Sequence, residues 1–298
     1  MALDVPTLII CNALTGFLLG TYCLLYSLRQ QTCPGFRCWI AAFFLLAAGF
    51  AALLARGPLP VWPSIILVNG CFMAVGLLRL DGSLRFLRAK ALSSWGYLAI
   101  PTLVALDSYF YLVDDNLRLR ALLFSIFIST SFVVAGRLYL LNRRTSNRGL
   151  YVTGGLTLMF YGGLLLARGI YVFMQPTILP KEQLSGLLTY DPYFLAAFLL
   201  ETTLGICFLL LNSNWLERAL LYSREELKTS LAELEIALTE LKVLRGILPI
   251  CASCKKIRDA SGIWTPVETY IHAHSEADFT HGMCPDCRRE FYPGVPDA

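Results

Sequence analysis

Long runs of apolar residues, separated by short polar segments, dominate the first 213 residues of the chain. Seven of these runs approach the roughly 20 residues that a helix needs to cross the apolar core of a bilayer. They are residues 7–28, 38–55, 60–79, 92–112, 121–142, 150–174 and 192–213. The third is the clearest, because residues 57–78 contain no charged side chain. The pattern predicts an all-α membrane protein with seven transmembrane helices in residues 1–213.

Beyond residue 213 the pattern changes to leucines at seven-residue intervals, with Glu and Lys between them. The leucines of this seam are Leu220, Leu227, Leu234, Leu241 and Leu248, with Leu231 and Leu238 at the alternate position. Such a heptad repeat is typical of a two-stranded coiled coil, and Pro249 ends it. Residues 214–248 are therefore predicted to form a helical linker about 50 Å long that pairs with a second copy in a homodimer. A single amphipathic helix lying on the bilayer or on the protein is the alternative.

Composition and charge agree with a membrane location and give an orientation. Only 15% of the residues are charged and 56% are hydrophobic, which is too few charges to cover a soluble domain of this size. If the N-terminus lies outside, the inner loops carry nine Lys and Arg residues and the outer loops four. The inner set is Arg29, Arg37, Arg79, Arg85, Arg88, Lys90, Arg143, Arg144 and Arg148, and the outer set is Arg56, Arg118, Arg120 and Lys181. This excess predicts a cytoplasmic C-terminus, and it accounts for the net charge of +4 without nucleic-acid binding.

Two CxxC pairs near the C-terminus have the spacing of metal ligands. Cys251 and Cys254 form the first pair, and Cys284 and Cys287 form the second. Two such pairs supply the four thiolates of a closed tetrahedral site, so we expect a structural Zn²⁺ in residues 249–298. His281, three residues before the second pair, is an alternative or second-shell ligand, and a four-cysteine iron–sulfur site is chemically possible. Zinc binding supplies an apparent ~10–16 kcal/mol in comparable peptides, which a domain this small needs in order to fold.

The residues between the two pairs predict a small α+β, zinc-ribbon-like module. A strand is expected around "GIWTPVE" and a helix around "ETYIHAHS". The whole stretch, "LPICASCKKIRDASGIWTPVETYIHAHSEADFTHGMCPDCRREFYP", resembles a C-terminal module of bacterial sensory and signal-transduction proteins, where it follows receiver or PAS domains through a helical linker. The resemblance implies a signalling protein, here in the bacterial inner membrane.

The membrane region is similar, more loosely, to the multi-span sensor regions that precede diguanylate cyclase domains. The segments "LDVPTLII", "LVNG" and "GLLRLDGSLRFLRAK" carry this similarity. A GGDEF-type cyclase signature does not follow the linker, so the similarity implies a sensor with a different output.

Ionisable residues inside the predicted spans are candidate site residues, because a charge at the bilayer centre is costly. Asp107, Arg168 and Glu201 lie at similar predicted depth, which suggests one cluster with Arg168 between two carboxylates. The cluster is either an ion pair that fixes helix packing or a site for a small polar or zwitterionic ligand, and proton-coupled transport is a third possibility. Five tyrosines are candidates to line such a pocket: Tyr109, Tyr111, Tyr161, Tyr171 and Tyr193.

Motifs for catalysis are missing: the sequence contains no Walker A loop, GxSxG elbow, HExxH motif or cyclase signature, so we do not expect an enzyme. The sequence predicts a membrane sensor that signals through a dimeric coiled coil to a zinc module, which contacts a cytosolic signalling protein. The alternatives are a transporter or channel with an accessory zinc module, and a direct sensor of zinc or redox state.

Overall fold

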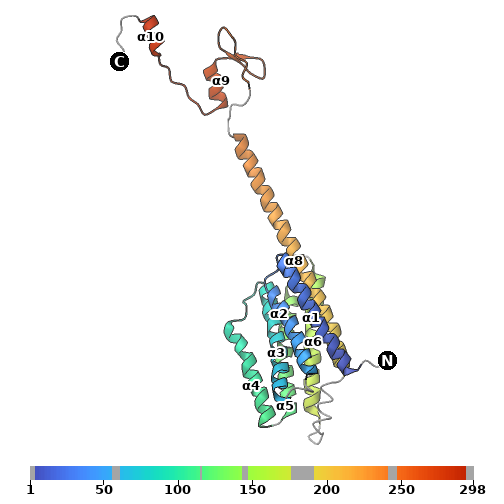
Figure 1. Cartoon of the computed structure of the whole chain (residues 1–298). Coiled ribbons are helices and arrows are strands. Elements are labelled where there is room, and N and C mark those ends of the chain that lie inside the picture. The colour runs from blue at the N-terminus through green and yellow to red at the C-terminus, as the bar shows by residue number, and fades with distance from the viewer. Residues whose placement is uncertain are drawn as a thin grey trace. The chain divides into compact units, whose positions relative to one another are not determined.

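Helices make up most of the computed structural model, which describes residues 4–55, 61–114, 116–142, 147–175, 191–240 and 247–292. The chain divides into two units, Met1–Leu220 and Leu221–Ala298, and each is described by itself. The first unit is a bundle of helices packed side by side (Figure 1).

Six helices in the described residues are long and apolar enough to cross a membrane. They are α1 (Val5–Arg29), α2 (Phe36–Leu54), α3 (Val61–Phe86), α5 (Leu117–Leu141), α6 (Arg148–Met174) and α8 (Asp191–Glu240). Six of the seven predicted spans therefore have the length and composition of membrane helices. The last of them continues past residue 213 into the predicted helical linker, because α8 is one helix of 50 residues, Asp191–Glu240.

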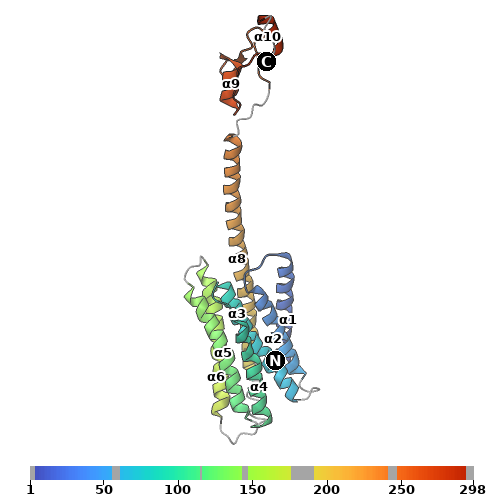
Figure 2. The same ribbon diagram turned by 90° about the vertical axis from the view of Figure 1, so that its left-hand side faces the viewer.

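The remaining predicted span, residues 92–112, differs from a single long helix. It consists of a short 3₁₀ helix, η1 (Ser94–Leu98), followed by the 14-residue α4 (Ala99–Leu112). Pro101 explains the break, because it has no N–H to donate to the preceding turn and cannot lie inside an α-helix that extends further back. Two views show α4 alongside α3 and α5, on which it packs (Figures 1 and 2).

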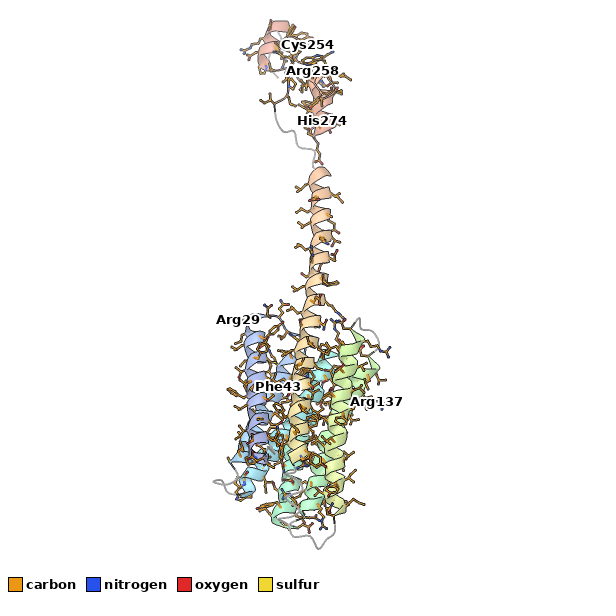
Figure 3. All side chains as sticks on the ribbon, turned by 90° about the vertical axis from the view of Figure 1, so that its right-hand side faces the viewer. Arg29, Phe43, Arg137, Cys254, Arg258 and His274 are labelled. Atoms are coloured by element: carbon orange, nitrogen blue, oxygen red, sulfur yellow. The ribbon has the colours of Figure 1, made fainter. Side chains whose placement is uncertain are left out.

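Aromatic side chains fill the interior of the bundle. Trp39 of α2 stacks on Phe208 of α8 with ring centroids 4.3 Å apart, and Phe43 meets the same ring edge-on. Figure 3 places Phe43 inside the bundle, whereas Arg137 projects from its outer surface. The last span is thus packed into the core and is not a peripheral helix.

Small residues bring α5 and α6 into close contact. Gly155, Gly162 and Gly169 recur every seven residues on α6 and face α5. A Cβ atom on Gly136 would lie 2.6 Å from the carbonyl oxygen of Gly155, so the backbones touch at this crossing. Close approach through small residues is a common way for helices to associate in a bilayer, where burial of apolar surface gives little driving force.

The second unit contains a two-stranded antiparallel sheet and two short helices. The strands are β1 (Ile257–Arg258) and β2 (Trp264–Thr265), and the helices are α9 (Val267–His274) and α10 (Pro285–Phe291). The Asp259 carboxylate accepts hydrogen bonds from the backbone N–H groups of Ser261 and Ile263, which closes the turn between the strands. The strand and helix predicted between the CxxC pairs are therefore present, in a sheet of only two strands.

Candidate functional site

Among the described residues of the bundle, three carboxylates are buried: Asp81, Asp107 and Glu201 are 0%, 6% and 1% exposed. Each lies on a different helix, α3, α4 and α8. Because a buried charge is stable only when it is paired or hydrogen-bonded, the partners of these groups show what holds the helices together.

Glu201 forms a fully buried ion pair with Arg79 of α3. Arg79 Nη1 donates to Glu201 Oε1 over 2.9 Å, and Nη2 contacts the second carboxylate oxygen. The guanidinium also lies over the Phe132 ring, 5.3 Å from its centroid. The phenol of Tyr161 interacts with the same carboxylate. This two-point contact fixes the rotation of α8 relative to α3, because only one face of each helix carries the matching group.

Asp107 makes a second ion pair, with Arg120 of α5. Arg120 Nε donates to Asp107 Oδ1 over 3.0 Å, and its Nη2 donates to Oδ2 over 3.2 Å. Asn69 of α3 donates to Oδ2 over 2.8 Å, and the Tyr111 ring lies 5.0 Å from the guanidinium carbon. Asp107 therefore joins α3, α4 and α5 near the end of α4.

The predicted single cluster of Asp107, Arg168 and Glu201 is wrong, because the two carboxylates belong to separate ion pairs. Arg168 of α6 is not the arginine in either pair, and its guanidinium lies over the Tyr193 ring at 5.7 Å from the centroid. Two of the tyrosines proposed to line a shared pocket, Tyr109 and Tyr171, are exposed instead.

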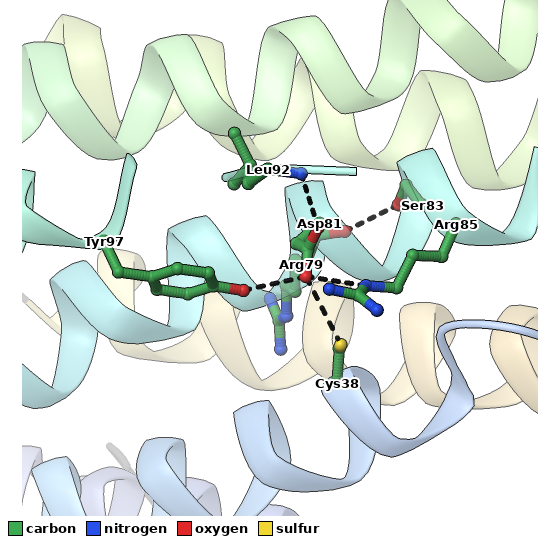
Figure 4. Close-up of polar contacts among 7 residues, drawn as sticks. All are labelled: Cys38, Arg79, Asp81, Ser83, Arg85, Leu92 and Tyr97. Atoms are coloured by element: carbon green, nitrogen blue, oxygen red, sulfur yellow. Dashed lines mark hydrogen bonds and ion pairs between the residues drawn. The ribbon is translucent and has the colours of Figure 1, made fainter. Parts of the chain in front are cut away.

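Asp81 is the third buried carboxylate, and it is not among the site residues predicted from the sequence. It accepts hydrogen bonds of 2.8 Å from the backbone N–H of Leu92 and the hydroxyl of Tyr97 (Figure 4). Arg85 Nε donates to it over 2.8 Å, and the Cys38 thiol of α2 lies 3.7 Å away. Asp81 thus ties the segment around η1 to α3 and α2.

Two arginines that the sequence analysis assigned to loops are members of the buried pairs. Arg79 is 0% exposed and Arg120 is 8% exposed, so neither is a loop charge. Without them, the predicted inner loops carry eight Lys and Arg residues instead of nine, and the predicted outer loops carry three instead of four. The excess of basic residues in the inner loops therefore remains. Four of the counted residues, Arg56, Arg143, Arg144 and Lys181, lie outside the described residues.

Each CxxC pair brings its own two sulfur atoms together. The first pair lies on a tight turn, in which Lys255 has a φ of 60° and its N–H donates to the Cys251 carbonyl over 3.0 Å. The backbone N–H groups of Cys254 and Ser253 lower the pKa of the Cys251 thiol. Thiolates are the form in which cysteine binds metals, so a turn that directs N–H groups at sulfur suits a metal ligand.

The second pair lies at the start of α10. Cys284 precedes the first turn of the helix, and the backbone N–H of Cys287 lowers the pKa of the Cys284 thiol. The neighbouring Cys284 raises the pKa of Cys287 in turn. His281 is exposed in the extended segment before this pair.

Among the described residues, no group of three or more His, Cys, Asp and Glu side chains is arranged to hold a metal ion. The predicted joining of the two CxxC pairs into one four-sulfur site therefore remains a prediction. The chemistry of the donors fits zinc, since four cysteines, two of them with lowered pKa, are the ligand set that Zn²⁺ prefers in closed sites.

Comparison with protein-family models, with curated proteins and with solved structures finds no match to this chain.

Proposed function

We propose that this protein is a membrane sensor in which α8 passes a change in the helix bundle to a cytoplasmic zinc module. The observation that carries the proposal is the continuity of α8 over Asp191–Glu240. Its first half contributes Glu201 to the buried pair and Phe208 to the aromatic core. Its second half belongs to the second unit. Because a helix is stiff, rotation of its buried half also rotates the rest.

We further propose that residues 94–112 complete a seventh crossing. At about 2.0 Å per residue in η1 and 1.5 Å in α4, the two helices together reach about 31 Å, close to the ~30 Å apolar core of a bilayer. An odd number of crossings places the two chain ends on opposite sides. The Lys and Arg bias then puts the N-terminus outside and the C-terminus in the cytoplasm of a bacterial inner membrane.

The exposed second half of α8 supports a parallel dimer. Among the seam leucines, Leu220, Leu227, Leu231, Leu234 and Leu238 are each 52–62% exposed, and Leu241 lies outside the described residues. A row of large apolar side chains along one helix is stable in water when a second helix covers it. The zinc module, held by Cys251, Cys254, Cys284 and Cys287, would then act as a pair that contacts a cytosolic signalling protein. Bound zinc supplies the folding energy of this module and no reaction chemistry.

The dimer is tested by the mass of the purified full chain in detergent, measured by light scattering. Leu227→Glu together with Leu234→Glu places charges in the seam and should convert two chains per particle into one. Thr229→Glu adds one charge of the same sign on the opposite side of the helix and should leave the dimer intact. A dimer that survives both seam charges would refute pairing through α8.

Transmission is tested by hydrogen–deuterium exchange in residues 221–240 of the full chain in vesicles. Glu201→Leu releases α8 from α3 and should change exchange in this stretch. Thr203→Leu is the matched control, because Thr203 lies on the same helix and its hydroxyl bonds only to the Leu199 carbonyl of that helix. Equal exchange in wild type and Glu201→Leu would rule out α8 as the transmitting element.

A further inference from the structure

The segment η1–α4 is attached to the bundle at both ends through buried carboxylates. Near its start, Asp81 of α3 binds the backbone of Leu92 and the hydroxyl of Tyr97. Near its end, its own Asp107 binds Asn69 of α3 and Arg120 of α5. These hydrogen bonds fix where the two ends of the segment lie against α3.

Between the two attachments, α2, α3 and α4 line a shallow, open groove of about 370 Å³. All of the residues that line it are apolar: Leu45, Ile66, Leu67, Gly70, Cys71, Ile100, Pro101 and Val104. Gly70 contributes no side chain to the groove, and a Cβ atom there would be in ordinary van der Waals contact with a methyl group of Val104, 3.7 Å away.

The groove opens on the outer surface of the bundle. Leu67 on α3 is 51% exposed, and Pro101 on α4 is exposed as well. The helices that form two of its walls, α2 and α3, are among the six with the length and composition of membrane spans. In a membrane, the opening therefore faces the hydrocarbon chains of the bilayer. These chains have no hydrogen-bonding groups, so an apolar lining suits them.

We propose that this groove is a binding site for one acyl chain of a bilayer phospholipid. The chain enters sideways from the membrane and lies along the groove between α4 and α3. An apolar lining with no hydrogen-bonding side chain selects an alkyl chain over a polar ligand. The site does not depend on the proposed signalling role, and binding is measured independently of any output.

The test uses the full chain in phosphatidylcholine vesicles that contain a phosphatidylcholine with a photoreactive diazirine in the middle of one acyl chain. After illumination, mass spectrometry compares labelling of residues 100–104 with labelling of Leu14 and Leu18. These two leucines on α1 are 55% and 64% exposed and report ordinary contact with the bilayer. Per residue, we expect several-fold more label in the groove. Equal labelling, as simple lipid contact would give, overturns the proposal, and so does weaker labelling, as a second protein chain over the groove would give.

Two substitutions fill the groove from opposite walls. Gly70→Leu from α3 and Val104→Phe from α4 should each reduce groove labelling at least threefold, while labelling of α1 stays constant. Gly163→Leu is the matched control, because a Cβ atom there meets nothing within 4 Å. It makes the same change in a helix and should leave the groove label unchanged. Wild-type labelling in both filled variants would overturn the proposal, and constant α1 labelling verifies that each variant is still inserted.

Discussion

Removing one member of the Arg79–Glu201 pair should destabilise the bundle far more than removing both. Arg79 is 0% exposed and Glu201 is 1% exposed, so water cannot solvate whichever charge is left behind. Breaking a buried pair from one side typically costs about 3–5 kcal/mol, whereas replacing the whole pair by apolar residues is often neutral or stabilising. We therefore expect Glu201→Leu to lose about 3–5 kcal/mol of unfolding free energy, and the double variant to lose less than either single one.

Each single variant leaves one buried group without its partner. Arginine stays charged at all accessible pH values, so Arg79 in the Glu201→Leu protein has no means of becoming neutral. The pair also contributes two charge-assisted hydrogen bonds, each worth about 1.5–3 kcal/mol, which agrees with the range above.

The assay is equilibrium unfolding of the purified chain in mixed detergent micelles, followed by far-ultraviolet circular dichroism. Wild type, both single variants and the double variant form a thermodynamic cycle, in which we expect a coupling energy of at least about 3 kcal/mol. Thr203→Leu on the same helix should change stability by no more than about 0.5 kcal/mol. Losses in the two single variants that add up to the loss in the double variant would show that the residues are independent, which would refute the argument.

Three further results are expected. Gly169→Val should lower the unfolding free energy by about 1–3 kcal/mol, because its side chain meets Ser125 of α5. Gly163→Val on the open face should cause no loss, because valine has a better helix propensity than glycine and a Cβ atom there meets nothing within 4 Å. Equal losses would contradict the close packing of α5 and α6. Replacing Cys254 by Ser should reduce bound zinc, measured by elemental mass spectrometry, from one per chain to none, while wild-type chain without stoichiometric zinc would disprove the metal site. Hydrogen bonds from the Ser261 hydroxyl and backbone N–H groups lower the pKa of Asp259, so the turn it closes is stabilised above the unfolded value of about 3.9 and loses that support as the pH falls through the folded value. Protection of the amides around this turn, measured as hydrogen exchange relative to the intrinsic rate at each pH, should fall below about pH 4 in wild type and not in Asp259→Asn. Unchanged wild-type protection across this range would count against the turn.

Several features of this protein follow from the sequence because they are properties of neighbouring residues. The spans are visible as apolar runs, since the length of a membrane helix is set by bilayer thickness. The leucine seam and the two CxxC spacings are also local patterns. The break before α4 has a local cause as well, the ring of Pro101, although hydropathy alone runs straight through it.

The partners in the buried ion pairs do not follow from the sequence, because they depend on how the helices are rotated and shifted relative to one another. Asp107 and Glu201 were recognised as buried, but their partners Arg120 and Arg79 lie at the ends of apolar runs and were counted as loop residues. In the sequence, each of these arginines lies within one or two helical turns of a hydrophobic stretch. That position does not distinguish a charge in a loop from a buried one.

Sequence by itself thus determined which segments are apolar enough to cross a membrane, where a leucine seam follows and which cysteines form CxxC pairs. Only the tertiary structure decided that α3 and α8 are joined by Arg79 and Glu201, that Asp81 and Asp107 fasten the two ends of η1–α4, and that a groove remains between them. The physical reason is that burial is encoded residue by residue, whereas contacts between distant segments arise from the packing of whole helix faces.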